Sequence, residues 1–317
     1  MPLEAVPNFS EGRDAATIDA IAGALSSHAE LLDVHSDPDH NRSVFTLVGD
    51  DEGVEGALVA AVAVARERID LREQEGAHPR IGAADVVPVV PVEPGDMERA
   101  RRAARRVAER IGTELSLPVF LYGELSPGRG PAFFRGGGTA ELSARLERGE
   151  LAPDFGPDRL HESAGGVIVG ARRALIAFNV DLADADLEAA RSIASLVRER
   201  DGGFPGVRAL GLDLPDSGRV QVSMNVEDWE ASALHEIVAR IEVEATARGA
   251  RVVGSGVGAG RADARGRCRR GGGRAASDRR LRRLSRARGA PSSPRRRPRE
   301  AGLDSRRGSA DGDRPDR

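Results

Sequence analysis

Short runs of β-branched and aromatic residues alternate with segments of helical periodicity along residues 3–253. Residues 43–49 form one such run, whose composition is typical of a strand. Ile18, Ile21, Ala22 and Leu25 follow the i, i+3, i+4, i+7 spacing of an amphipathic helix. Helices that connect successive strands cross over a sheet and cover one of its faces. The alternation therefore predicts an α/β (α+β) fold.

The expected elements divide into two halves. In residues 1–165 they alternate as strand, helix, strand, strand, helix, strand, helix, strand, and a Gly-, Pro- and Arg-rich stretch with a short helix follows. Residues 166–255 give the strand–helix–strand–strand–helix–strand order of a ferredoxin-like unit. We therefore expect two ferredoxin-like-type α/β subdomains with mixed sheets, at 1–165 and 166–255. The expected helices are 54–69, 95–111, 139–148, 184–200 and 232–247, with one more after the helix-capping Asp14.

The charge of the chain changes sharply after residue 255. The chain has 47 basic residues, all of them Arg, and 50 acidic residues. Residues 256–317 contain 20 of the basic and 7 of the acidic residues, whereas residues 1–255 contain 27 basic and 43 acidic residues. The same tail holds three Leu and no Ile, Met or aromatic residue. So little apolar surface cannot offset the ordering entropy, so this tail is predicted to be disordered.

Two interpretations of this tail remain open. GC-rich codons read out of frame yield mostly Arg, Gly, Ala and Pro, so residues from about 256 onward look like a frameshift product. The alternative is a genuine basic arm that binds nucleic acid by neutralising phosphates.

Several classes of protein are disfavoured by the sequence. It contains no run of 18 apolar residues, so we expect no membrane-spanning helix. Its first residues lack the basic and then apolar segments of a signal peptide. The single cysteine, Cys268, excludes an internal disulfide and a multi-Cys metal site. We expect a cytoplasmic protein.

His78 is the first candidate for chemistry, because it lies among Gly and Pro between a helical segment and an apolar strand. A histidine in such a loop can act as a general base near neutral pH, although a turn-capping surface histidine has the same pattern. A second cluster, residues 35–42, contains two His and two Asp. Pro38 prevents the helix that would align metal ligands, so this cluster is either a polar turn or a carboxylate site built on Asn41 and Arg42.

Two glycine-containing stretches complete the candidates. Residues 156–166 either line a cleft or form a flexible connector. Residues 254–260 mimic a dinucleotide-binding fingerprint, but no apolar helix or well-placed acidic residue follows them.

Seven separated stretches, in order along residues 2–255, resemble the glutamate formimidoyltransferase family, also called glutamate formiminotransferase. These stretches are residues 6–13, 41–46, 78–83, 121–124, 152–157, 170–172 and 221–225. The resemblance implies transfer of a formimidoyl group from N-formimidoyl-L-glutamate to N5 of tetrahydrofolate, a late step in histidine breakdown. It implies two α/β subdomains with folate between them, tetrahydrofolate as co-substrate, no metal, and a homodimer as the family tendency.

The resemblance also implies roles for particular residues. It places the catalytic histidine at His78 and the folate-binding segment at Gly156, Pro157, Asp158, Arg159, Leu160, His161, Glu162, Ser163, Ala164 and Gly165. Residues 159–164 depart from the more aromatic pattern of the animal enzymes. Those enzymes carry a cyclodeaminase domain after the transferase, and nothing here matches it, so a stand-alone transferase is implied.

The chemistry of such a transfer agrees with the residues present. One histidine can take the proton from N5 and give it to the departing glutamate nitrogen. Both substrates carry carboxylates, so Asn41, Arg42, Arg80 and Arg135 are our candidates for substrate binding. We expect valine at Gly156 or Gly165 to weaken folate binding with little change in fold. A folate-binding protein without turnover and, through the Arg-rich tail, a nucleic-acid binder are the alternatives; we expect neither nucleic acid nor a membrane as partner.

Overall fold

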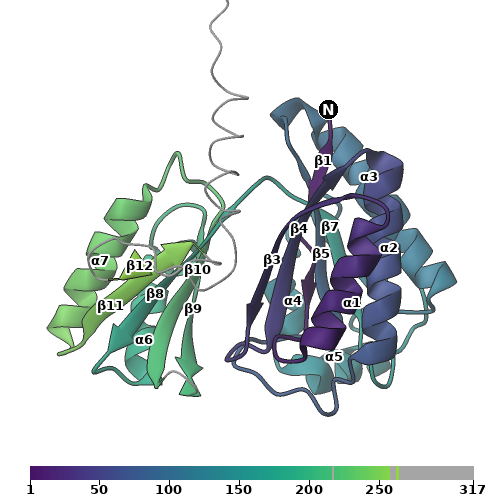
Figure 1. Cartoon of the computed structure of the whole chain (residues 1–317). Coiled ribbons are helices and arrows are strands. Elements are labelled where there is room, and N and C mark those ends of the chain that lie inside the picture. The colour runs from purple at the N-terminus through teal and green to yellow at the C-terminus, as the bar shows by residue number, and fades with distance from the viewer. Residues whose placement is uncertain (216–217, 258–261, 264–317) are drawn as a thin grey trace, which may run out of the picture. The chain divides into compact units, whose positions relative to one another are not determined.

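The computed structural model describes residues 1–215, 218–257 and 262–263 (Figure 1). Its first sheet has seven strands, in the order β3–β4–β1/β2–β5–β7–β6. Strands β5, β7 and β6 are parallel and the other pairings are antiparallel, so this sheet is mixed, as predicted. The strands are β1 (Leu3–Ala5), β2 (Asn8–Phe9), β3 (Glu30–Asp37), β4 (Arg42–Gly49), β5 (Ala84–Pro91), β6 (Val119–Gly123) and β7 (Val167–Ala171).

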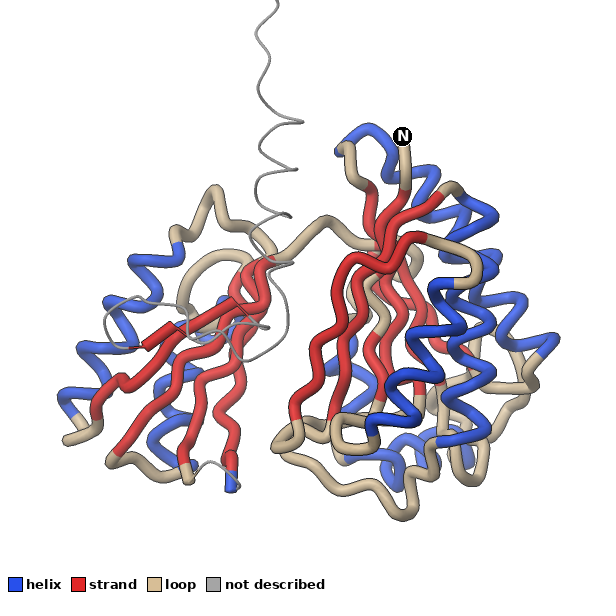
Figure 2. Tube along the Cα trace, in the orientation of Figure 1, coloured by secondary structure: helices blue, strands red, loops and turns tan. Residues whose placement is uncertain are grey.

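Helices pack on both faces of the first sheet (Figures 1 and 2). One face, with Phe45 and Val87, packs against α1 (Ala15–Ser26), α2 (Asp51–Arg68) and α3 (Met97–Glu114), which follows the short η1 (Pro94–Asp96). On the other face, Phe120 and Ile168 pack against α4 (Pro131–Arg135) and α5 (Gly138–Glu147). Among the described residues, no helix is both long and apolar enough to cross a bilayer.

Side-chain caps explain where several helices begin. Asp14 accepts hydrogen bonds from the backbone N–H groups of Ala16 and Thr17, so α1 starts where the sequence predicts. Asp50 accepts from Gly53, which starts α2 three residues before the predicted helix at 54–69. Asp186 caps α6, so that helix starts later than the predicted residue 184.

The second sheet is antiparallel throughout, in the order β12–β11–β8–β10–β9, so the prediction of a mixed sheet is wrong for this half. Helices α6 (Leu187–Val197) and α7 (Leu234–Ala247) share an apolar core with its strands, and the short η2 (Glu199–Asp201) follows α6. The four longer strands have the order of a ferredoxin-like sheet. The strands are β8 (Ile176–Ala183), β9 (Val207–Leu214), β10 (Arg219–Val226), β11 (Arg251–Val257) and β12 (Ala262–Asp263).

Two strands lie differently from the expected division of the chain. We assigned residues 166–175 to the second half, but β7 pairs in parallel with β5 and β6 and completes the first sheet. Strand β11 continues past residue 255, and Gly256 still pairs with Asn179 of β8. We predicted disorder for residues 256–317. Apart from 256–257 and 262–263, these residues lie outside the described part of the chain.

Candidate active site

His78 lies in the loop between α2 and β5, and this loop is anchored to the segment that precedes β7. Ala83 donates its backbone N–H to the carbonyl of Ala164 at 2.9 Å. Gly82 passes so close to this segment that a Cβ atom would lie 1.9 Å from the carbonyl oxygen of Gly166. Only glycine permits this approach, so the loop that carries His78 is fixed by backbone contacts.

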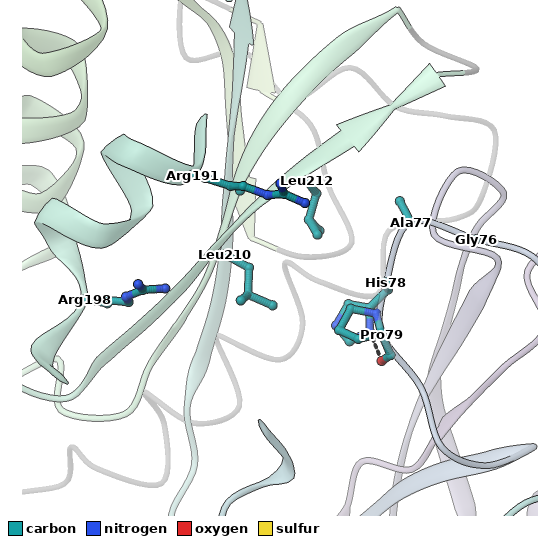
Figure 3. Close-up of a pocket in the computed structure, with 9 residues that line it drawn as sticks. Gly76, Ala77, His78, Pro79, Arg191, Arg198, Leu210 and Leu212 are labelled. Atoms are coloured by element: carbon teal, nitrogen blue, oxygen red, sulfur yellow. Dashed lines mark hydrogen bonds between the residues drawn. The ribbon is translucent and has the colours of Figure 1, made fainter. Parts of the chain in front are cut away.

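The surroundings of the His78 ring determine its protonation. Nδ1 lies 2.8 Å from the carbonyl oxygen of Pro79, which can only accept a hydrogen bond, so Nδ1 carries the proton (Figure 3). Arg42 Nη1, which can only donate, lies 3.2 Å from the same Nδ1 and would require it to be unprotonated; we assign the proton to Nδ1 because the contact with Pro79 is the shorter of the two. Burial, followed by the charges of Arg42 and Arg135 and the neighbouring His40, holds the pKa of His78 well below its usual value. The ring is therefore neutral near pH 7, with a lone pair on Nε2.

A buried carboxylate, Asp85, organises the charges beside His78. It is fully enclosed, and it accepts hydrogen bonds from the Ile81 N–H at 2.9 Å, from Arg42 Nη1 at 2.8 Å and from Arg135 Nη2. Burial by itself would raise the pKa of Asp85, but Arg135 and Arg42 lower it below the usual value. Two guanidinium groups share one carboxylate, so the cluster carries net positive charge.

Separate elements supply the parts of this cluster. Arg42 is the first residue of β4, Arg135 is the last of α4, and Asp85 lies near the start of β5. Asn8 of β2 accepts hydrogen bonds from Nε and Nη2 of Arg42 at 3.1 and 3.0 Å. Burial, opposed by Asp85, lowers the pKa of Arg42 to about 10, which leaves it charged at neutral pH. The folding of the first sheet thus places Arg42 against His78.

Asn41 and Arg80 also lie at this site, but both bond to the protein's own backbone. Asn41 adopts a left-handed conformation with φ of 43°; its side chain accepts from the Gly12 N–H at 2.9 Å and donates to the Glu75 carbonyl at 2.9 Å. Arg80 donates to the carbonyls of Asn41 and His40 at 3.0 and 2.8 Å. We predicted that these two residues bind substrate, but in the structure their hydrogen bonds connect the loops around His78.

The polar cluster at residues 35–42 forms the connection between β3 and β4. Asp37 Oδ1 accepts from the His40 N–H at 2.9 Å, and Asn41 N–H donates to the Pro38 carbonyl at 3.2 Å, so the turn that we weighed from the sequence is present. His40 is buried, and its ring centroid lies 6.1 Å from that of His78. In the described ranges, no group of three or more His, Cys, Asp or Glu side chains could hold a metal ion.

The glycines at the ends of the expected folate-binding segment have structural roles. Gly156 and Gly165 have φ of +82° and +67°, in the left-handed region that favours glycine. An added Cβ would lie 2.1 Å from the carbonyl oxygen of Leu117 or of Ile81, respectively. The expectation that valine at either position changes the fold little is therefore wrong.

The second part of this segment is a turn beside the loop that carries His78. His161 and Gly165 exchange two backbone hydrogen bonds of 2.9 Å, and the Ser163 carbonyl accepts from the Leu71 N–H at 2.8 Å. The side chain of Glu162 pairs with Arg72 at 2.7 Å. These bonds place residues 161–165 next to both ends of the His78 loop.

His78 borders a pocket of about 500 Å³, a size that is usual for small-molecule sites (Figure 3). Within the described part of the chain, no residue of 156–165 lines it. The sequence did not single out Arg191 and Arg198, which line this pocket; the guanidinium group of Arg198 is ion-paired with Asp201. The lining residues are Gly76, Ala77, His78, Pro79, Arg191, Arg198, Leu210, Gly211 and Leu212.

Asp85 and Asn8 are site residues that sequence reasoning missed. Asp85 begins an otherwise apolar run, 85–91, and a carboxylate in a buried strand requires a charged partner. That signal could have identified it as a partner for Arg42. Asn8 lies in the family-like stretch 6–13, but its contact with Arg42 depends on the pairing of β2 with β4, which the residue type does not indicate.

Comparison with known proteins places most of the chain in one family. Residues 2–172 match the family described as "Formiminotransferase domain, N-terminal subdomain", and residues 177–259 match the "Formiminotransferase domain". The chain is 40% identical to the glutamate formimidoyltransferase of Streptococcus pyogenes serotype M1, over 80% of this chain and 87% of that protein. It is 39% identical to the glutamate formimidoyltransferase of Thermoplasma acidophilum, over 78% and 84%.

A longer relative matches over the same region. The chain is 42% identical to the formimidoyltransferase-cyclodeaminase of Rattus norvegicus, over 80% of this chain and 49% of that protein. The two family matches together span most of the 317 residues and meet between β7 and β8, where the first sheet ends. The chain therefore belongs to the formiminotransferase family.

Proposed function

We propose that this protein transfers the formimidoyl group of N-formimidoyl-L-glutamate to N5 of tetrahydrofolate, releasing L-glutamate and 5-formimidoyltetrahydrofolate, as a step of histidine degradation. Membership of the formiminotransferase family and the names of the two microbial relatives support this activity. The observation that carries the proposal is the neutral His78, whose Nε2 lone pair is available beside a cluster of guanidinium groups.

His78 acts in this proposal as base and then as acid. N5 attacks the amidine carbon, the C=N electron pair moves to nitrogen, and a tetrahedral intermediate forms. Nε2 of His78 takes the proton that N5 loses. The imidazolium then gives this proton to the glutamate nitrogen, whose bond to the carbon breaks, while the lone pair on the other nitrogen re-forms the C=N bond of the formimidoyl group, now on N5. One side chain can serve both transfers because its neutral form is the resting form.

The basic side chains serve binding. Arg42 and Arg135 carry one more positive charge than Asp85 neutralises, which favours anionic groups near His78. Arg191 lines the same pocket as His78 and suits the carboxylates that both substrates carry, whereas Arg198, also in the lining, is ion-paired with Asp201. Asn41 and Arg80 contribute by holding the loops on which His40 and His78 lie.

Tetrahydrofolate is the proposed co-substrate, with residues 156–165 as its contact segment. The backbone bonds between residues 161–165 and the loop that carries His78 support this assignment, because folate held at the turn lies near the catalytic loop. We propose a reaction without a metal, since the proton transfers need only one histidine.

A coupled assay tests the activity. The purified full-length chain, mixed with N-formimidoyl-L-glutamate and tetrahydrofolate, should release glutamate and form 5-formimidoyltetrahydrofolate in equal amounts, and omission of tetrahydrofolate should stop the release. Binding of tetrahydrofolate without any glutamate release would support the folate-binding alternative and contradict transfer.

A further inference from the structure

His40 is a buried titratable group that the proposed mechanism does not use. The residue is 8% exposed, and within the described part of the chain its Nε2 atom has no hydrogen-bond partner. Buried polar atoms in native proteins nearly always have partners, because an unpaired one costs stability. The unpaired atom belongs to a ring whose centroid lies 6.1 Å from that of His78.

The neighbours of His40 determine which kind of group Nε2 can bind. Nδ1 lies 3.8 Å from Asp37 Oδ2, and this carboxylate favours a proton on Nδ1. Burial is the main cause that lowers the pKa of His40; the charge of Arg42 lowers it further, while Asp37 and Asp39 oppose this. The ring is therefore neutral at pH 7. The Asp37 carboxylate is too distant for a hydrogen bond but its charge favours the tautomer with the proton on Nδ1, in which Nε2 is an acceptor for an N–H or O–H donor.

We propose that His40 Nε2 accepts a hydrogen bond from the N–H of the formimidoyl group, and so makes the site select a formimidoyl donor over a formyl donor. This inference rests on the proposed function. A formyl group places a carbonyl oxygen, which only accepts, where the formimidoyl group has N–H. Sites built to bond a substrate N–H discriminate strongly against analogues that lack it, because the buried acceptor is left unpaired.

The geometry around His78 agrees with this role. Arg42 contacts His78 at Nδ1, so the guanidinium cluster and the lone pair on Nε2 lie at different nitrogens of the ring. A group two or three atoms across can contact two imidazole rings whose centroids are 6.1 Å apart. His40 Nε2 is closed off from solvent, and His40 does not line the pocket that His78 borders, so contact with the substrate requires a side chain to move.

Two substitutions separate this role from simple packing. His40→Gln keeps a polar atom near the position of Nε2, whereas His40→Asn keeps one only near Nδ1. Binding of N-formimidoyl-L-glutamate and of N-formyl-L-glutamate is measured by calorimetry for the wild type and both variants, together with kcat/KM. The ratio of the two dissociation constants is insensitive to the fraction of folded protein.

We expect the wild type to prefer the formimidoyl ligand. His40→Asn should reduce this preference by about tenfold or more, and His40→Gln should retain most of it. If His40→Asn weakened both ligands equally, so that the ratio of their dissociation constants stayed that of the wild type, the assignment would be overturned. A wild type that binds with the expected preference but releases no glutamate would contradict the proposed function and leave the selectivity of His40 standing.

Discussion

The carboxylate of Asp85 lies 2.8 Å from Arg42 Nη1, and Asp85 is completely enclosed by the protein. The same Oδ2 atom also accepts from Arg135. One buried carboxylate thus joins the start of β5, the start of β4 and the end of α4, and it holds the guanidinium group that contacts His78. The stability of the first half and the charge at the candidate site therefore depend on the same residue.

Replacement of this carboxylate should be costly. Asp85→Asn leaves two buried guanidinium groups without a counter-charge, so we expect the free energy of unfolding in urea to fall by about 3–5 kcal/mol. The matched control is Glu114→Gln, which removes the partner of Arg110 on the exposed surface of α3 and should change little. A loss for Asp85→Asn no larger than for the control would show that the cluster does not stabilise the fold.

The pH dependence of kcat/KM should report the depressed pKa of His78. Because burial and the nearby Arg42 and Arg135 lower this pKa well below 6.5, the neutral base persists as the pH falls through 6.5. The acidic limb should therefore lie below pH 6.5. Arg42→Gln removes a nearby positive charge and should move this limb to higher pH, whatever its effect on the maximal rate. An acidic limb at the same pH in both proteins would exclude Arg42 as a cause of the shift.

Alanine substitutions should separate backbone strain from close contact at two glycines. Gly165 and Gly149 both have positive φ, +67° and +70°, so alanine at either should cost about 1–2 kcal/mol from the left-handed conformation. At Gly149 nothing lies within 4 Å of the added Cβ, whereas at Gly165 it meets the Ile81 carbonyl oxygen at 2.1 Å. Thermal unfolding should therefore show a much larger loss for Gly165→Ala. Equal losses would mean that the turn relaxes freely.

Local features of the fold could be predicted from the sequence, whereas its long-range pairings could not. Asp14 and the spacing of Ile18, Ile21 and Leu25 are local signals, and α1 begins and packs as they predict. Helix α4 has only five residues, too few for a periodic pattern. The insertion of β7 between β5 and β6 depends on parallel pairing between segments far apart in the chain, which alternation within a strand cannot show.

At the candidate site, too, some residues could be predicted from the sequence and others could not. His78 could be predicted because its loop resembles a family motif, and Arg42 because it ends a polar cluster. A carboxylate in an apolar run indicates that Asp85 needs a charged partner, but that it joins Arg42 to Arg135 is seen only once the sheet has formed. The unpaired Nε2 of His40 likewise follows only from what surrounds the folded ring. Asn41 and Arg80 hold loops in place by hydrogen bonds to backbone carbonyls. The positions of those carbonyls cannot be predicted from the residue types.

The proposed frameshift predicts a particular result at the DNA level. Strand β11 pairs through Val257, and the family match extends to residue 259, so the break should lie near or just after these codons. Independent resequencing should find a one-base insertion or deletion there, followed by a frame that encodes an apolar, helix-forming segment. An unbroken frame, or peptides matching residues 264–317 in the protein purified from its natural host, would show that the basic tail is genuine.

The most direct test of the central claim is the turnover of His78→Gln. Glutamine keeps a polar side chain of similar size but cannot take up the proton from N5. We expect kcat to fall by roughly two to four orders of magnitude, the usual range for a lost general acid–base group, while the affinity for tetrahydrofolate stays near that of the wild type. Turnover close to the wild-type rate, in a variant that binds tetrahydrofolate normally, would contradict the assignment of His78 as the group that moves the proton.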